Sequence, residues 1–256
     1  MCLITFAYNK HPKYRLILAA NRDEFYGRPT RRAQFWDEDG RPDILAGKDL
    51  EAGGTWMGVC KSGKWAALTN YRDPNWKLDN PPSRGELVLN FLMNGNTSQE
   101  YLETLHKEAD RYIGYNILLG DSSGIIHFSN HDKSPKVIEA GLHGVSNALL
   151  DTPWPKLEKA KSSLETHVDS YEIDKEHLFS FLNDETQAPD ETLPETGIPY
   201  KWEKAVSSLF IKTENYGTRC SSILLIDHDG SIEFTERRFI QGTHDILEEN
   251  TYSIPA

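Results

Sequence analysis

The chain opens with MCLITFAYNKHPKYRLILAANRDEF (residues 1–25), in which two apolar runs are separated by a short polar one. Residues 3–7 and 15–20 are rich in strand-forming side chains, and residues 9–12 (Asn-Lys-His-Pro) are typical of a turn. This pattern predicts a β-hairpin whose first strand begins almost at the first residue. The second strand runs directly into four polar residues, Asn-Arg-Asp-Glu, at positions 21–24.

The same alternation of apolar runs and turns recurs along the chain. Residues 55–60 and 65–70 flank a Lys-Ser-Gly-Lys turn and predict a second hairpin. Further hairpins or strands are predicted for residues 115–129, 136–139, 142–146 and 221–235.

Helical signals lie between these hairpins. Ser83 and Thr97 each precede a glutamate with the spacing of a capping box, and apolar residues then recur every three or four positions. A helix is therefore predicted after each of them. Further helices are predicted for residues 155–167, 175–182 (capped by Asp174) and 200–209, and the acidic segment 183–199, which contains three prolines, is predicted to be a long surface loop.

The order of these elements indicates the fold class. Hairpins, rather than single strands, alternate with helices, which argues against a doubly wound parallel sheet. We expect an α+β fold in which mainly antiparallel sheets are covered by helices. The pattern contains no internal repeat, so one domain over residues 1–256 is expected.

Composition narrows the function classes. The 256 residues include 39 Asp and Glu against 28 Lys and Arg, which gives a formal net charge of −11, and 38% are hydrophobic. Such a chain folds, and its charge disfavours nucleic-acid binding. No apolar run reaches the roughly 18 residues that span a bilayer, and no secretory signal is recognised. Three widely spaced cysteines form neither a disulfide framework nor a metal motif, so we expect a cytoplasmic protein without a transmembrane segment or a metal.

Cys2 is the first candidate for chemistry because it directly follows the initiator methionine. Its small side chain favours removal of Met1, after which one residue would bear a thiol and a free α-amino group. An α-amino group has a pKa of roughly 7.7–8.0, so it can take the thiol proton and later return it. Nucleophile and base would then lie in one residue. The alternative is a small buried side chain at the start of a strand.

The polar segment 21–24 is the second candidate. Placing a cation between carboxylates and an amide at a strand end is costly unless these groups pair or serve a site. Asp23 would hold an α-ammonium group, and Arg22 would favour a thiolate. The alternative is a solvated polar turn.

Three further segments, 68–72, 144–147 and 216–222, place hydrogen-bond donors at the ends of predicted strands. Acyl transfer requires two donors aimed at the developing oxyanion, and asparagine amides meet this requirement. Each segment taken alone is also typical of a turn, so the inference of a site rests on the three segments together.

Together these segments resemble the NRDE family, whose eukaryotic relatives are called transport and Golgi organisation proteins. The likeness extends over most of the chain. It is carried by Cys2 with Asn21-Arg22-Asp23-Glu24 and by Gly53-Gly54-Thr55-Trp56, Leu68-Thr69-Asn70-Tyr71-Arg72, Ser83-Arg84-Gly85, Gly144-Val145-Ser146-Asn147, Trp154-Pro155-Lys156 and Gly217-Thr218-Arg219.

The family is similar in turn to the N-terminal-nucleophile hydrolases of the penicillin acylase and bile-salt hydrolase type. This resemblance implies a four-layer αββα sandwich of two mainly antiparallel sheets. Arg22 departs from the pattern, because bile-salt hydrolases place the early arginine three residues before the aspartate. On a strand, Arg22 would project to the face opposite Asp23. The implied roles are Cys2 as nucleophile, Asp23 as the carboxylate near the α-amino group, Asn70 and Asn147 as oxyanion donors, and Arg219 as the late arginine.

The resemblance implies an N-terminal cysteine amidohydrolase that acts on a linear amide or related acyl substrate through a thioester, without a cofactor. The alternative is a non-catalytic carrier or chaperone of haem or another hydrophobic or lipid ligand, because NRDE relatives are linked to haem trafficking and lipid metabolism. Cys2 or a histidine would then be an axial ligand. A partner-binding module is the third alternative. Aromatic residues that would line a ligand pocket or form a core are Trp36, Trp56, Trp65, Tyr71 and Trp76.

His127 and His131 have the spacing of a metal-binding pair on a helix. They straddle a predicted strand and turn, so they are not expected to share a face or to bind a metal.

Overall fold

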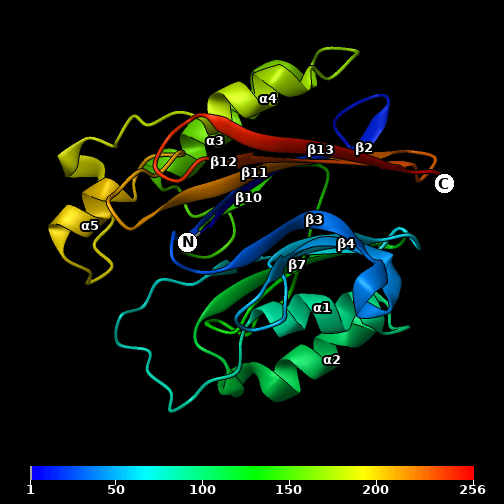
Figure 1. The fold of residues 1–256 in the computed structure, drawn as a ribbon, viewed down its shortest axis with the longest axis horizontal. Coiled ribbons are helices and arrows are strands. Elements are labelled where there is room, and N and C mark those ends of the chain that lie inside the picture. The colour runs from blue at the N-terminus through cyan, green and yellow to red at the C-terminus, as the bar shows by residue number, and fades with distance from the viewer. Residues whose placement is uncertain (1) are drawn as a thin grey trace. The chain divides into compact units, whose positions relative to one another are not determined.

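The computed structural model describes residues 2–256, which divide into two compact units (Figure 1). The terminal unit contains the residues up to Gly27 together with Glu139–Ser146 and Leu150–Ala256. The central unit contains Arg28–Ile138 and Asn147–Leu149. The expected single domain over residues 1–256 stays a prediction.

The terminal unit is built on a six-stranded sheet in which all neighbouring strands are antiparallel. The N-terminal hairpin forms as predicted, and its second strand pairs with a strand from the last part of the chain. Segments from both ends of the sequence therefore lie at the centre of one sheet. Across the sheet the strands are β10 (Gly141–Val145), β1 (Cys2–Tyr8), β2 (Tyr14–Phe25), β11 (Tyr216–Asp227), β12 (Ile232–Phe239) and β13 (Ile246–Ile254).

Two helices, α3 (Pro155–Val168) and α4 (Lys175–Leu182), cover one face of this sheet, as Figure 1 shows. Helix α3 packs against β1, and α4 packs against β2 and β11. The predicted cap of α4 is confirmed, because the side chain of Asp174 accepts a hydrogen bond from the Glu176 N–H. The apolar core beneath the helices includes Ala7, Ile17, Leu164, Val168, Leu178, Phe179, Ile223 and Leu225.

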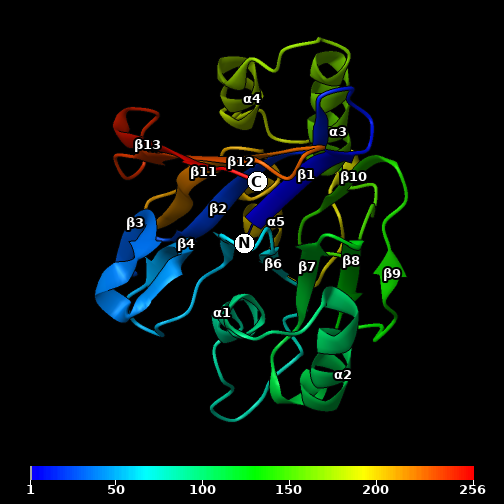
Figure 2. The ribbon, with the colours of Figure 1, turned by 90° about the vertical axis from the view of Figure 1, so that its right-hand side faces the viewer.

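The central unit contains a second, seven-stranded sheet, which is also antiparallel throughout. Helices α1 (Gly85–Met93) and α2 (Ser98–Glu108) lie on the same side of this sheet (Figure 2). The α+β class with two antiparallel sheets is therefore confirmed. In order, the strands are β3 (Thr30–Trp36), β4 (Arg41–Asp49), β5 (Met57–Cys60), β6 (Trp65–Asn70), β7 (Tyr115–Asp121), β8 (Gly124–Ser129) and β9 (Lys136–Val137).

The two predicted capping boxes have different outcomes. At α2 the box is present: the Thr97 hydroxyl accepts from the Glu100 N–H, and the Glu100 carboxylate accepts from the Thr97 N–H. At α1 the prediction is wrong, since the helix begins at Gly85 and no side chain caps it. The Gly85 carbonyl is held instead by the Thr55 N–H at 3.1 Å, which fixes the start of α1 against the segment before β5.

The remaining differences concern three strands and the segment 183–209. Strands β3, β4 and β13 form where no strand was predicted. The acidic segment 183–199 is largely a loop, as predicted, and contains one short turn, η3 (Asp190–Thr192). Helix α5 (Tyr200–Ala205) is shorter than the predicted helix, and the other short helical turns are η1 (Asp37–Asp39) and η2 (Ala109–Arg111). None of the helices within residues 2–256 is both long and apolar enough to cross a membrane.

Candidate active site

Cys2 lies at the start of β1, directly opposite Arg22 of β2, and Arg22 in turn lies opposite Cys220 of β11. Directly paired residues of an antiparallel sheet project to the same face, so this row places the Arg22 guanidinium between two thiols. Asp23, the next residue of β2, projects to the other face. The expected divergence of Arg22 and Asp23 is thus present, and Arg22 shares its face with Cys2.

The Cys2 thiol is buried, with 8% of the residue exposed. Burial raises the pKa of this thiol, and the Asp23 carboxylate adds to the effect, while the Arg22 charge opposes it. The Cys2 carbonyl accepts a hydrogen bond of 3.2 Å from the Ser146 hydroxyl, which fixes the backbone at this strand end. At neutral pH the thiol is therefore protonated, and a nucleophilic role would require a base. All three cysteines, Cys2, Cys60 and Cys220, are free, as expected.

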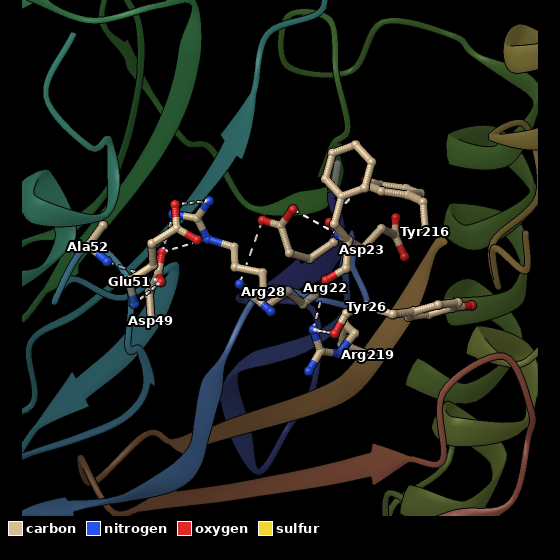
Figure 3. A network of polar contacts seen from close by, with 11 residues as sticks. Arg22, Asp23, Tyr26, Arg28, Asp49, Glu51, Ala52, Tyr216 and Arg219 are labelled. Carbon is tan, nitrogen blue, oxygen red and sulfur yellow. Dashed lines mark hydrogen bonds and ion pairs between the residues drawn. The ribbon is translucent and has the colours of Figure 1, made fainter. Parts of the chain in front are cut away.

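Asp23 is almost completely buried, with 2% of the residue exposed. Its Oδ1 accepts a 2.7 Å hydrogen bond from the Thr218 hydroxyl. Its backbone carbonyl accepts one of 3.0 Å from the Tyr216 hydroxyl, and Figure 3 shows Asp23 and Tyr216. Burial raises the pKa of Asp23, whereas Lys156, Thr218 and Arg22 lower it. The buried carboxyl group is thus held by one side chain of β11, Thr218, while Tyr216 holds the Asp23 backbone and the charges of Lys156 and Arg22 act on the carboxyl.

The register also places Asp23 relative to the start of the chain. Because β1 and β2 are antiparallel and Cys2 pairs with Arg22, Asp23 lies on the N-terminal side of Cys2, where the backbone nitrogen of Cys2 is. The predicted removal of Met1 concerns a residue outside the described part of the chain.

Arg219 occupies the irregular position between Thr218, which pairs with Asp23, and Cys220, which pairs with Arg22. Its Nη1 donates to the carbonyl of Phe25 at 2.9 Å and to that of Tyr26 at 3.3 Å (Figure 3). Burial lowers the pKa of Arg219, and the charge of Arg22 adds to this effect. Arg219 therefore fixes the end of β2 immediately after the polar segment.

Asn70 and Asn147 belong to the central unit, where they contact each other. The Asn147 side-chain amide donates to the Asn70 carbonyl at 2.9 Å, and the Arg72 N–H donates to the Asn147 carbonyl at 2.7 Å. The predicted site residues thus form two groups, one in each unit. The oxyanion role of this asparagine pair stays a prediction.

A separate polar network in the central unit fixes the turn that follows β4. Arg28 donates from Nε and Nη2 to one oxygen of Asp49 at 2.9 and 2.7 Å, and the other oxygen accepts from the Glu51 and Ala52 N–H groups (Figure 3). This turn leads to Gly54, where an added Cβ would lie 2.5 Å from the Gly85 carbonyl carbon. Two of the quoted sequence segments therefore meet backbone to backbone.

The five aromatic residues expected either to line a ligand pocket or to form a core are buried or half-buried. Trp36 and Trp65 are fully buried, so they are core residues.

His127 is buried and bonds to Asn116, whereas His131 packs edge-on against Tyr71. Within residues 2–256 no group of three or more His, Cys, Asp or Glu side chains is arranged to hold a metal ion.

Four residues of the site were not predicted from the sequence. Lys156 is 4% exposed and donates to the Val206 carbonyl at 3.1 Å, and its charge acts on Asp23. Ser146, Tyr216 and Thr218 hold Cys2 and Asp23 through the hydrogen bonds described above. All four lie in or next to the segments quoted for the resemblance, which is the signal that would have selected them.

The two antiparallel sheets and their helices correspond to the fold class of the N-terminal-nucleophile hydrolases. Among solved structures, the chain is similar to the N-acylethanolamine-hydrolyzing acid amidase ortholog of Caenorhabditis elegans, with a TM-score of 0.50 and 12% identity, covering 88% of this chain and 92% of that one. At this identity the likeness concerns the fold alone, and it confirms the predicted fold.

The chain belongs to the Transport and Golgi organisation 2 family, whose family model matches residues 1–241. It is 38% identical to the Transport and Golgi organization 2 homolog of Mus musculus over 98% of each chain. Identity to the Homo sapiens homolog is also 38%, again over 98% of each chain. The resemblance drawn from the sequence is thereby confirmed.

Proposed function

We propose that the protein is an N-terminal cysteine amidohydrolase that cleaves a linear amide through a thioester intermediate. The observation that carries this proposal is the register of β1 and β2, which places buried Asp23 on the N-terminal side of Cys2. Removal of Met1 would leave the α-amino group of Cys2 at this carboxylate. A protonated resting thiol then has its base within the same residue.

In the acylation step, the α-amino group takes the thiol proton and the Cys2 sulfur attacks the carbonyl carbon of the amide. Asp23 holds the ammonium group that results. Collapse of the tetrahedral intermediate breaks the C–N bond, and the ammonium proton passes to the leaving amine. The products are a Cys2 thioester and a free amine.

In the deacylation step, the α-amino group takes a proton from water, and the water oxygen attacks the thioester carbon. The C–S bond then breaks, and the sulfur recovers its proton from the ammonium group. In this proposal Asn70 and Asn147 stabilise the oxyanion in both steps. Arg219 and Arg22 contribute positive charge near the thiol, and neither of them accepts or donates the transferred proton.

A linear amide is the substrate class to test first. The structural relative is named for hydrolysis of N-acylethanolamines, and this name supplies the starting panel.

A cytoplasmic location is part of the proposal, since all three cysteines are free thiols.

The test is hydrolysis of a panel of N-acyl amides by protein prepared with Cys2 as its first residue. We expect release of the amine and, after rapid acid quench, an acyl adduct on Cys2 by mass spectrometry. Cys2→Ser, which replaces the sulfur nucleophile with an oxygen, is the matched control, and Cys2→Ala should show neither product nor adduct. Equal amine release by wild type and Cys2→Ala would contradict the proposal.

A carrier of a hydrophobic or lipid ligand is the second candidate, because aromatic residues beside the site are exposed. Phe25 is 56% exposed and packs edge-on against Tyr216, which also contacts the partly exposed Trp202. A haem titration followed by absorbance, with Cys2→Ala as comparison, tests it. A spectral change at micromolar haem that Cys2→Ala abolishes supports the carrier, and an unchanged spectrum argues against it.

A further inference from the structure

Lys156 stands in an unfavourable position for a lysine. It is the second residue of α3, immediately after Pro155, so its positive charge lies at the positive end of the helix dipole. It is also buried, with 4% of the residue exposed, and donates to the Val206 carbonyl. An ammonium group in such surroundings is costly unless an anion compensates it.

Asp23 is an anion on which the Lys156 charge acts. Its strand neighbour Asn21, on the same face of β2, pairs with Leu3, and Leu3 packs in one apolar cluster with Leu157 of α3. Asp23 therefore faces the layer that contains the start of α3, and the Lys156 charge acts on it there.

The surroundings of Asp23 are polar on several sides. Strand β11 contributes the Thr218 and Tyr216 hydroxyls, and the charge of Arg22, which projects from the opposite face of β2, also acts on the carboxyl group. Thr218 and Tyr216 orient the residue but carry no charge. Lys156 is the cation that a second structural layer supplies.

The electrostatic balance of this pair has a consequence for the proposed reaction. A lone carboxylate beside the Cys2 amine would favour the protonated amine, which cannot act as a base. A carboxylate whose charge is offset by a nearby ammonium group can still accept a hydrogen bond from the amine, and it favours the protonated amine less.

We propose that Lys156 is a positioning residue that keeps Asp23 ionised in the helix–sheet interface and lets it orient the Cys2 amine without fixing a proton on it. This inference rests on the proposed amidohydrolase function. Lys156 acts through Asp23 and contacts no reacting atom.

The direct test is the titration of the Asp23 carboxyl, followed by ¹³C NMR in wild type, Lys156→Met, Lys156→Arg and Lys159→Met. Lys159 lies on the same helix but is exposed and pairs with Asp184, so its substitution is the matched control. We expect Lys156→Met to strengthen proton binding by Asp23 about tenfold, Lys156→Arg to restore much of the wild-type value, and Lys159→Met to have no effect. An unchanged Asp23 titration in Lys156→Met would overturn the proposal.

A double-mutant cycle in chemical unfolding provides the second test. Lys156→Met should lower the folding equilibrium constant in the wild-type background and in an Asp23→Asn background. The factor by which it falls should be roughly ten times smaller in the Asp23→Asn background, because the partner charge has been removed. Additive effects would overturn the pairing. If Lys156→Met alone does not fold, recovery of folding in the double variant supports the pair, and failure to recover contradicts it.

These measurements separate the two proposals. The Asp23 titration and the unfolding cycle need neither turnover nor removal of Met1, so they remain decisive in a protein that hydrolyses no amide. In an active protein, the acidic limb of the pH–rate profile should move to higher pH in Lys156→Met and return in Lys156→Arg. A loss of rate without this movement would indicate a merely structural lysine.

Discussion

The Thr218 hydroxyl donates to Oδ1 of Asp23 over 2.7 Å, and the two residues face each other directly across β2 and β11. The same hydroxyl accepts a hydrogen bond of 2.9 Å from the Ile211 N–H. Because its accepting side is engaged by a backbone donor, the hydroxyl proton is directed at the carboxylate. Thr218 thus orients Asp23 in the buried layer beside the start of β1.

Thr218→Val tests this orientation. The substitution keeps the shape of the side chain and removes the donor, so the pKa of Asp23 should rise and unfolding should become easier by about 1–3 kcal/mol. Amide hydrolysis should fall, with its acidic limb moved to higher pH. Thr218→Ser, which keeps the hydroxyl, should resemble wild type in both measurements, and a Thr218→Val protein with an unchanged pH–rate profile would argue against the role.

Gly217→Ala should destabilise the protein. An added Cβ would overlap both the Tyr26 hydroxyl and the Ile211 carbonyl oxygen, and the backbone carbonyl cannot move aside cheaply. We expect a loss of about 1–3 kcal/mol in denaturant unfolding. Tyr26→Phe removes only one of the two obstacles, so Gly217→Ala should remain destabilising in that background. Full recovery there would show that the tyrosine alone restricts the position.

Arg22 should control the reactivity of Cys2, which it faces across β1 and β2. Removing its charge raises the pKa of the thiol beyond the value set by burial, so iodoacetamide should modify Arg22→Gln more slowly at a fixed pH. The expected decrease is about tenfold for each unit of pKa. Arg15→Gln, the same change elsewhere on β2, is the control. Equal alkylation rates at Cys2 in Arg22→Gln and wild type would contradict this relationship.

The His143–Asp151 pair should give stability a pH dependence. The hydrogen bond with Asp151 raises the pKa of His143. Burial tends to raise the pKa of Asp151, but the hydrogen bonds from His143 and from the Gly144 N–H outweigh it and hold the Asp151 pKa below its usual range. The His143 contribution is fully present below its unfolded pKa of about 6.5 and is lost as pH rises through the raised value. The Asp151 contribution is present above about pH 3.9 and is lost as pH falls through the depressed value.

The His143–Asp151 pair thus contributes most to stability between about pH 3.9 and 6.5, where both contributions are fully present. Thermal unfolding near pH 5.5 should show His143→Gln melting about 2–4 °C below wild type, for a loss of roughly 1 kcal/mol, and the gap should narrow near pH 8.5. A gap that is the same at both pH values would exclude a role for the histidine charge.

Local sequence signals were sufficient for much of the fold. The β1–β2 hairpin and the Thr97 capping box depend on neighbouring residues, and both formed as predicted. Strands β3 and β13 were missed because they are mostly polar or charged, so their apolar alternation is weak, and β13 also exposes much of its length. Ser83 failed as a cap because a contact between distant segments, Gly85 with Thr55, determines where α1 begins.

The candidate site was predictable in composition but not in geometry. Cys2, Asp23 and Arg219 could be selected from the sequence, whereas the row of Cys2, Arg22 and Cys220 depends on strand pairing across the whole chain. Lys156 was missed because a lysine at the start of a helix ordinarily faces solvent. Its burial becomes evident only when α3 packs on the sheet.

The most direct test of the account is the intact mass of the purified chain expressed with its native start. The account predicts a mass lower than that of the encoded chain by one methionine residue, which leaves Cys2 with an unmodified α-amino group. A chain that retains Met1 would have its Cys2 nitrogen in a peptide bond, and the proposed chemistry would then be contradicted.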